Sequence, residues 1–313
     1  TMAELQGLFI KVGQLNSILT NFLPAEFRNE LDGLQERVPP RPYKDIQKRI
    51  QEEFSGQGPE ELFLEFDPSP IASASIGQVH RATTHKGERI VLKIQYPGVA
   101  DSIDSDVDNI ATLFRVTKLL PKHMDITGLL RDAKAQLHEE ADYRQEARYL
   151  QAFQSALSDN DHYLIPKFYP EHSSTRVLAM EYIEGEAIES ISDLDPAIID
   201  TMMQQLFELT FKELFDLRLM QTDANFANYL FQHHSQKIAL LDFGASRHFS
   251  KRFAMDYKRL LRAVCADNKD NIVAAADRLG YEASTANDAY REFLILVFRI
   301  ALEPIAKKGL YDF

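Results

Sequence analysis

The stretch Leu219-Met220-Gln221-Thr222-Asp223-Ala224-Asn225-Phe226-Ala227-Asn228-Tyr229-Leu230-Phe231 decides how the rest of the chain is interpreted. An apolar segment leads into one carboxylate, Asp223, and an amide, Asn228, follows five residues later. A second stretch, Lys237-Ile238-Ala239-Leu240-Leu241-Asp242-Phe243-Gly244, predicts a short apolar strand that ends in a second carboxylate. The pattern therefore places two carboxylates and an amide at the ends of apolar segments.

This set of side chains is typical of enzymes that transfer a phosphoryl group from a nucleotide. Such an enzyme needs a carboxylate beside the acceptor, and an amide plus a second carboxylate that hold magnesium against the phosphates. Asp-Phe-Gly alone is a weak signal because a tripeptide recurs by chance. The D-x-x-x-x-N pattern that ends fourteen residues before Asp242 makes the combination specific. The competing interpretation is a β-hairpin with polar loops and no ligand.

Length and composition limit the class of protein. The chain has 313 residues, enough for about two domains with substantial cores. A formal net charge of -12 argues against a broad nucleic-acid-binding surface, so we expect no nucleic-acid partner. The single cysteine, Cys265, excludes an internal disulfide framework and a multi-cysteine zinc site.

The printed sequence contains no targeting or membrane-spanning segment. No apolar run reaches the roughly 18 residues that a membrane span requires, and no signal peptide is present. Because the sequence starts at Thr1 and stops after Phe313, we expect a piece of a longer protein, whose membrane anchors could lie outside it.

Residues 1–60 predict a helical extension. Apolar residues recur at helical spacing up to Phe22, and a further helix is expected after the prolines that end at Pro42. A cation, a flexible backbone position and an amide interrupt the first helix: Lys11, Gly13 and Gln14. From spacing alone, these residues are best explained as a solvated turn of an amphipathic helix.

A loop of small residues follows, and we expect it to approach phosphate. Its residues are Ala72, Ser73, Ala74, Ser75, Ile76, Gly77, Gln78 and Val79. Small side chains let backbone N–H groups come close to phosphate oxygens. Alanine and serine restrict the backbone more than glycine does. Taken alone, the segment fits a tight β-turn without a ligand equally well.

An apolar strand then carries one lysine, Lys93. A buried lysine needs a partner, and in a nucleotide site its partners are phosphate and a carboxylate. A long helix predicted over residues 126–156 places Glu139, Asp142 and Glu146 on one face. These carboxylates repel one another unless cations offset the repulsion, so part of this face could pair with Lys93. The alternatives are a solvent-facing lysine and ordinary solvated helix charges.

The order of elements predicts an α+β, two-lobed nucleotide enzyme. We expect a helical extension over 1–60, a lobe with a small sheet and a long helix over 61–184, and a mostly helical lobe over 185–313. The nucleotide is expected in the crevice between the lobes, with adenine against the short segment that connects the two lobes. The connector residues in question are Met180, Glu181 and Ile183. The absence of an Ala-Pro-Glu segment after Asp-Phe-Gly counts against a conventional protein kinase.

Taken together, these segments closely resemble the UbiB/ADCK (AarF-type) family of atypical kinases, which support coenzyme Q biosynthesis. The resemblance covers nearly the whole chain in order. The matching pieces are Lys11–Gln14, Ala72–Val79, Lys93–Val99, Glu140–Tyr143, Gln221–Asn228 and Leu241–Ala245. The Lys-x-Gly-Gln and Glu-x-Asp motifs are peculiar to this family, whereas Asp-Phe-Gly is not.

The resemblance implies a protein-kinase-like fold, with ATP and magnesium as cofactors, and it assigns roles to residues. Lys93 would bind the nucleotide phosphates, with Glu146 as its helix partner. Asp223 would be the catalytic-loop carboxylate, and Asn228 and Asp242 would be the magnesium ligands. The alanine-rich loop and the connector would bind the nucleotide.

The family's own motifs imply a closed site. Glu140 and Asp142 would face the N-terminal extension that carries Lys11, Gly13 and Gln14, and this extension would pack where a protein substrate otherwise binds. The resemblance therefore reverses the interpretation of the first helix as a merely solvated turn. Three departures stand out from common kinase patterns: Leu92 at an expected adenine contact, Ser73 within the alanine-rich loop, and Gln221-Thr222-Asp223 in place of His-Arg-Asp.

The family further implies partners and a location. These are lipid or quinone precursors, quinone-biosynthesis enzymes and a membrane, at the cytoplasmic face of a bacterial inner membrane or, alternatively, in a mitochondrion or plastid. Two other functions stay open at this point. One is a nucleotide-gated scaffold for biosynthetic enzymes that transfers no phosphoryl group. The other is a small-molecule phosphotransferase, which the N-terminal extension argues against.

Overall fold

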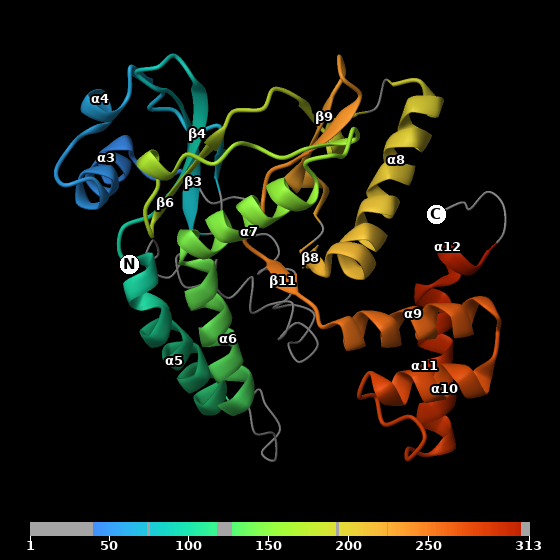
Figure 1. The fold of residues 1–313 in the computed structure, drawn as a ribbon. Helices are drawn as coiled ribbons and strands as arrows, with labels where there is room; N and C mark the ends of the chain where they lie inside the picture. The colour runs from blue at the N-terminus through green and yellow to red at the C-terminus, as the bar shows by residue number, and fades with distance from the viewer. Residues whose placement is uncertain (1–39, 74–75, 118–126, 192–193, 224, 308–313) are drawn as a thin grey trace. The chain divides into compact units, whose positions relative to one another are not determined.

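The computed structural model describes residues 40–73, 76–117, 127–191, 194–223 and 225–307 (Figure 1). The helix expected up to Phe22 lies outside the described residues, as do Lys11, Gly13, Gln14, Ala74 and Ser75. No helix of the described ranges is long and apolar enough to cross a membrane.

The chain divides into two compact units, and each is described by itself. The first contains Thr1–Ile191 and Asn225–Ala245, and the second contains Ser192–Ala224 and Ser246–Phe313. The segment that carries Asn228 and Asp242 thus belongs with the strand that carries Lys93. The lobe boundaries expected near residues 184 and 185 stay a prediction.

An antiparallel sheet in the first unit carries the lysine. Its order is β1 (Glu65–Phe66), β3 (Gly77–Thr83), β4 (Arg89–Gln95) and β6 (Val177–Glu181), and β2 (Ala72–Ser73) also pairs with β3. The strands β3, β4 and β6 lie side by side in Figure 1. Val79 and Leu178 flank Lys93 in the register.

Alternation along β4 places Ile90, Leu92 and Ile94 on the core face and Lys93 on the other face. Ile90, Leu92 and Ile94 are fully buried, in a cluster that includes residues of α3 (Tyr43–Glu53). Fully burying an aliphatic side chain of this size contributes about 1.5–3 kcal/mol. The expected adenine contact at Leu92 is therefore wrong, because Val91 is the residue that shares the face of Lys93.

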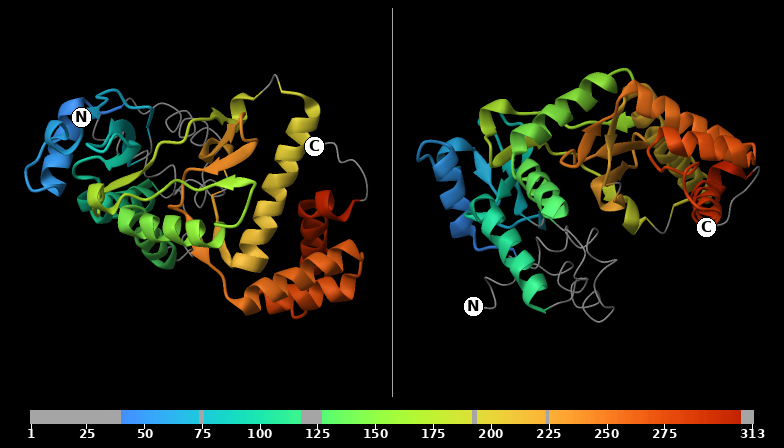
Figure 2. Two further views of the ribbon diagram at one scale, coloured as in Figure 1. Left: turned by 45° about the horizontal axis from the view of Figure 1, so that its top comes forward. Right: turned by 90° about the horizontal axis from the view of Figure 1, so that it is seen from below.

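The helices that follow the sheet differ from the expected pattern. We predicted one helix over residues 126–156, but the structure has α6 (Thr127–Glu140) and α7 (Tyr143–Ala156), joined at Ala141 and Asp142. Asp142 leaves the helical conformation and caps α7, accepting a hydrogen bond from the N–H of Arg144 at 3.1 Å. The single face of Glu139, Asp142 and Glu146 therefore does not form. α6 lies beside α5 (Val99–Thr117) in both figures (Figures 1 and 2).

A second sheet of the first unit brings the candidate metal ligands to one edge. Its order is β5 (Tyr163–Leu164), β10 (Lys237–Leu240), β9 (Tyr229–Gln232) and β7 (Glu186–Ala187). β9 and β10 form an antiparallel hairpin in which Tyr229 pairs with Leu240. Asn228 precedes β9 and Asp242 follows β10, so both residues stand at the same end of the hairpin. The N–H of Leu241 donates to the carbonyl oxygen of Asn228 at 3.0 Å.

The first unit also contains short helical turns, which complete its connections. These are α4 (Pro59–Leu62), η1 (Pro170–His172), η2 (Ile188–Ser190) and η4 (Phe226–Asn228).

The second unit is mostly helical. α8 (Pro196–Phe211) is followed by a π-helical turn, η3 (Lys212–Leu217), and by β8 (Leu219–Gln221), which pairs with β11 (Ser246–His248). The remaining helices are α9 (Lys251–Cys265), α10 (Lys269–Arg278), α11 (Asp288–Ala301) and α12 (Glu303–Ala306). α9, α10 and α11, drawn in orange and red, pack together in every view (Figures 1 and 2). Side-chain caps at Asp195, Ser250, Asn268 and Asn287 define where four of these helices begin.

Candidate functional site

Lys93 lies between two carboxylates in the first unit. Its Nζ is 2.9 Å from each carboxylate oxygen of Glu146, on α7, and 3.5 Å from Oδ2 of Asp242, which follows β10. The structure thus brings to Lys93 two residues that lie 53 and 149 positions away in the sequence. Lys93 is not the solvent-facing lysine of the alternative interpretation, since 13% of its side chain is exposed.

One cation faces two carboxylates at this site, and the ionisation of the groups reflects the imbalance. Burial raises the pKa of Glu146, Lys93 lowers it, and Asp242 raises it again, with a result of about 7. Burial lowers the pKa of Lys93, but Asp242 and Glu146 outweigh that effect and hold it above its usual value. Although burial raises the pKa of Asp242, the lysine and the N–H of Gly244 keep it below its usual value. The site has an excess of negative charge that a further cation would offset.

The Asp-Phe-Gly turn is fixed by its own backbone and by α7. The N–H of Gly244 donates to Oδ1 of Asp242 at 2.8 Å, and the N–H of Phe243 approaches Oε1 of Glu146 at 3.5 Å. The Phe243 side chain is buried against Phe153 of α7, with ring centroids 5.4 Å apart. These contacts hold the Asp242 carboxylate next to Lys93.

Asp242 and Asn228 fit a magnesium ion that is bound together with a nucleotide. Magnesium prefers oxygen ligands and is usually bound by one or two carboxylates plus substrate phosphates and water. The hairpin of β9 and β10 places the Asp242 carboxylate and the Asn228 amide at the same end. Within the ranges that the structure describes, no three His, Cys, Asp or Glu residues gather into a metal site of their own. The chain therefore provides a partial ligand set, which phosphate oxygens and water would complete.

The alanine-rich loop enters the sheet through β2 and β3. Alternation in this sheet puts Val79 on the face of Lys93, opposite it in the register. Gln78 lies on the other face and is fully buried, where its Oε1 accepts the N–H of Arg41 at 2.9 Å. Its Nε2 lies 2.8 Å from Nε2 of His80. The Gln78 side chain thus anchors the residues before α3, and the nucleotide contacts expected of the loop's backbone stay a prediction.

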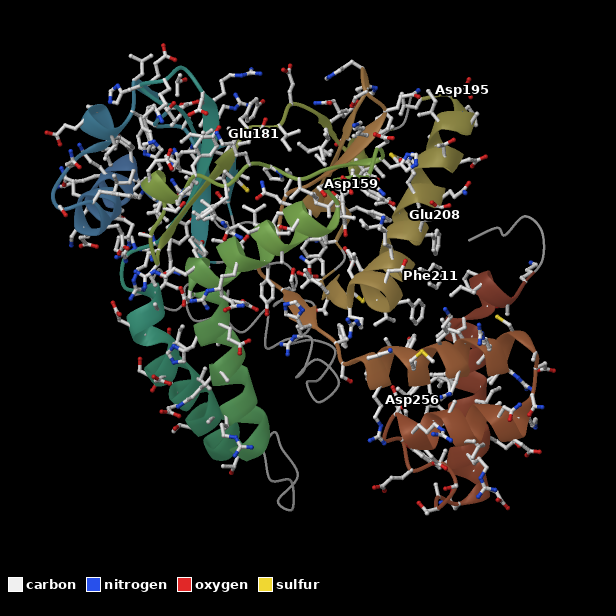
Figure 3. The ribbon with its side chains drawn as sticks, viewed as in Figure 1. Asp159, Glu181, Asp195, Glu208, Phe211 and Asp256 are labelled. Atoms are coloured by element: carbon white, nitrogen blue, oxygen red, sulfur yellow. The ribbon has the colours of Figure 1, made fainter. Side chains whose placement is uncertain are left out.

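The connector residues are also placed by the register. Met180 pairs with Val91 and so shares the face of Lys93. Glu181, labelled in Figure 3, ends β6, is exposed, and accepts the N–H of Lys167 at 3.1 Å. Ile183 is half-buried beyond the end of β6. The nucleotide contacts of these residues stay a prediction.

Gly77 is glycine for a packing reason. A Cβ at this position would lie 2.4 Å from the carbonyl oxygen of Ile94 and 2.9 Å from Oη of Tyr143. Neither atom can move easily, since one is backbone and the other belongs to a side chain that is 1% exposed. The need for a small residue at the start of β3 thus follows from contact with β4 and α7.

We expect Gly77→Ala to destabilise the protein by at least about 2 kcal/mol, because overpacking a rigid contact typically costs about 1–3 kcal/mol. Urea denaturation measures the change. Gly128→Ala on α6 is the matched control, since nothing lies within 4 Å of an added Cβ there and alanine favours a helix. Equal stability of Gly77→Ala and the wild type would contradict the packing argument.

Tyr143 and Gln95 are residues near the site that sequence reasoning missed. The Tyr143 ring centroid is 5.4 Å from Nζ of Lys93, a distance at which a cation and an aromatic face attract. Gln95 is fully buried, and its Nε2 donates to the carbonyl oxygen of Ala141 at 3.0 Å. This bond ties β4 to the junction before α7, which carries Glu146. Tyr143 stands directly after the Glu-x-Asp motif, and that position was the available signal.

The family-specific acidic residues have separate local roles. Asp142 caps α7, as described above, and is the last residue before the helix that presents Glu146. Glu140 ends α6 and is half-buried. The residues they were expected to face, Lys11, Gly13 and Gln14, lie outside the described residues, so this expectation stays a prediction.

Asp223 belongs to the second unit. It follows β8 and is exposed, and its N–H donates to Oε1 of Gln221 at 2.8 Å. Gln221 is buried and pairs with Ser246 of β11. The strand pair β8 and β11 thus fixes the backbone that leads into Asp223.

Comparisons with known proteins identify the family of the chain. Residues 33–276 match the family model described as "ABC1 atypical kinase-like domain". The atypical kinase COQ8, mitochondrial, of Saccharomyces cerevisiae is 34% identical over 293 residues, which cover 92% of this chain and 58% of the relative. The atypical kinase COQ8B, mitochondrial, of Rattus norvegicus is 34% identical over 318 residues, which cover 100% of this chain and 59% of the relative.

A solved structure is similar as well. It is described as the complex of Rv3197 with erythromycin from Mycobacterium tuberculosis, and the match has a TM-score of 0.62 at 28% identity, covering 86% of this chain and 68% of that one. The chain spans about three fifths of the length of the first two curated relatives. On the matched family model and these relatives, the chain belongs to the ABC1 (UbiB/AarF) family of atypical kinases and has its kinase-like α+β fold.

Proposed function

We propose that the chain is an ATP- and magnesium-dependent atypical kinase or ATPase that supports prenylated-quinone (coenzyme Q) biosynthesis. The observation that carries the proposal is the position of Lys93 between Glu146 and Asp242. A lysine fixed by a helix glutamate and shared with a metal-binding aspartate is the arrangement that phosphoryl transfer requires. The names of the mitochondrial relatives support the quinone pathway and favour the mitochondrial alternative for the location.

Each residue would have a defined task. Lys93 would bind nucleotide phosphate oxygens, and Glu146 would hold its ammonium in place. Asp242 and Asn228 would bind magnesium, which would offset the charge of the phosphates when bound. Asp223 would orient the attacking hydroxyl or water. Catalysis of this kind depends on positioning and on charge neutralisation more than on covalent chemistry.

The partners form part of the proposal. The nucleotide is ATP, and the further partners are lipid or quinone precursors, quinone-biosynthesis enzymes and a membrane. The extension that carries Lys11, Gly13 and Gln14 would exclude protein substrates, and the acceptor would then be a small lipid or water.

The decisive experiment separates phosphoryl transfer from a scaffold role. A host that lacks the corresponding relative and makes no quinone is supplied with the wild type, Asp223→Asn or Lys93→Met, and its quinone is measured by mass spectrometry. We expect both variants to abolish quinone production. When lipid extracts are incubated with labelled ATP and the wild type, we expect either a lipid to become labelled or labelled phosphate to be released from ATP.

Asp200→Asn is the matched control, because this residue is an exposed aspartate on α8. Normal quinone production with Asp223→Asn, together with none from Lys93→Met, would favour a nucleotide-gated scaffold. That result would overturn the proposal of phosphoryl transfer while leaving nucleotide binding in place.

A further inference from the structure

A buried carboxyl group lies in the π-helical turn that directly follows α8. In Figure 3, Asp195 marks the start of α8 and Phe211 its end, and the π-helical turn η3 begins at the next residue. Glu213 of this turn is 3% exposed. Among the described residues, no Lys, Arg or His forms an ion pair with it. π-helical turns of this kind are often found at functional sites.

The Glu213 carboxyl is the first of two links that lead to Asp223. Its Oε2 accepts a hydrogen bond from the N–H of Gln221 at 3.3 Å, and Oε1 of Gln221 accepts one from the N–H of Asp223 at 2.8 Å. Gln221 is 4% exposed, so its bond to Glu213 is buried, and its bond to the exposed Asp223 is partly buried. The turn, the end of β8 and the backbone of Asp223 are therefore joined in one chain of bonds.

The burial of this carboxyl group lowers the stability of the folded chain. Burial raises the pKa of Glu213, against the opposing hydrogen bond from Gln221, to about 8. Its Oε1 has no hydrogen-bond partner among the described residues. A buried polar atom without a partner destabilises a fold, and an apolar side chain of similar size avoids that penalty. A role in stability alone does not account for glutamate here, whereas the acceptor it presents to Gln221 does.

We infer that Glu213 is a positioning residue, which holds Asp223 in place through Gln221. The inference rests on the proposed role of Asp223 in orienting the attacking group. A catalytic group has to be held within about 0.5 Å of its productive position, and a misplacement of about 1 Å can lower the rate by about 100-fold. Asp223 is exposed, so its backbone has to be fixed from the buried side, and Glu213 and Gln221 lie there.

The test compares Glu213→Leu, Glu213→Gln and Gln221→Ala in steady-state ATP turnover. Glu213→Leu removes the acceptor, so we expect kcat to fall at least about 10-fold, while KM for magnesium-ATP stays within about 2-fold because Lys93 and Asp242 are untouched. Glu213→Gln keeps an acceptor oxygen and should retain kcat within about 2-fold. Amide hydrogen exchange at Gln221 and Asp223 should accelerate in Glu213→Leu and not in Glu213→Gln.

Gln221→Ala removes the second link and leaves the buried carboxyl in place. We expect it to lower kcat as Glu213→Leu does, and the double variant to show no further loss, because the two residues act in series. Glu208→Gln, an exposed glutamate on α8 that is labelled in Figure 3, is the control and should match the wild type.

Normal kcat and normal exchange in Glu213→Leu overturn the inference. If that variant does not fold, normal kcat in Gln221→Ala overturns it equally. An equal loss in Glu213→Gln and Glu213→Leu also overturns it, because the acceptor would then not be what matters. Asp223→Asn in the same assay separates the two proposals. If it is as active as the wild type, the proposed role of Asp223 fails. If it is inactive while Glu213→Leu is normal, only the positioning role fails.

Discussion

Asp242→Asn is expected to abolish magnesium-dependent nucleotide turnover while leaving the fold intact. The amide keeps an oxygen that can accept the N–H of Gly244, so the Asp-Phe-Gly turn should hold its conformation. The change removes the anionic oxygen that would bind magnesium and that now lies 3.5 Å from Lys93. Loss of one group that stabilises the transition-state charge lowers kcat by about 100- to 1,000-fold, and we expect a loss at the upper end of that range.

Phosphate release at a series of magnesium concentrations measures the effect. The wild type should show a saturable dependence on magnesium, and Asp242→Asn should show none. Asp161→Asn is the matched control in the same unit, because this aspartate is exposed. Turnover like that of the wild type in Asp242→Asn would contradict the assignment of Asp242 as a metal ligand.

Lys93→Met should make the stability of the protein strongly dependent on pH. The variant leaves Glu146 buried beside Asp242 without a cation, and removal of one partner of a buried pair typically costs about 3–5 kcal/mol. The pKa of Glu146 is about 7 in the folded protein, above the ordinary 4.5. A raised pKa contributes stability that is complete below about pH 4.5 and is lost as the pH rises through 7. Because Lys93 lowers the pKa of Glu146, its removal raises that pKa further, and the stability lost at high pH becomes larger.

Urea denaturation at pH 5 and pH 8 tests this expectation. The gap between Lys93→Met and the wild type should be small at pH 5, where Glu146 is protonated, and larger by several kcal/mol at pH 8. Adding Glu146→Gln to Lys93→Met should restore most of the stability at pH 8. Lys44→Met, on an exposed position of α3, should change little at either pH. A destabilisation of the same size at both pH values would falsify the account of the pair.

The residue types of the candidate site could be recognised from local patterns. Asp223, Asn228 and Asp242 are recognisable because a catalytic motif is a short run of fixed residue types, and the family resemblance is confirmed by the match over residues 33–276. Alternation in strands is local too, and it could have shown that Leu92 points away from Lys93. The expected adenine contact at Leu92 failed because Leu92 directly precedes Lys93 in β4, so the two side chains point to opposite faces of the sheet.

The break between α6 and α7 could not be predicted from helical spacing. Glu139, Asp142 and Glu146 satisfy the spacing of one helical face, but Asp142 also suits a cap, and periodicity does not distinguish the two. In the folded chain Asp142 is a cap, because Gln95 of β4 donates a hydrogen bond to the carbonyl oxygen of Ala141 and the helix is interrupted there. The burial of Glu213 could not be predicted for a similar reason, since no local sequence pattern around it indicates a π-helical turn that points its side chain into the core.

The family, the α+β class and the kinds of groups in the candidate site are readable from the sequence, because these depend on residue types at short spacing. Which of these groups contact one another depends on how distant segments pack. Lys93 contacts Glu146 and Asp242, which lie 53 and 149 positions away in the sequence. The Gln78 side chain points away from the site and accepts a hydrogen bond from the N–H of Arg41. Such contacts follow from the register of β3 with β4 and from the packing of α7, and the balance of charge at the site exists only once those elements are in place.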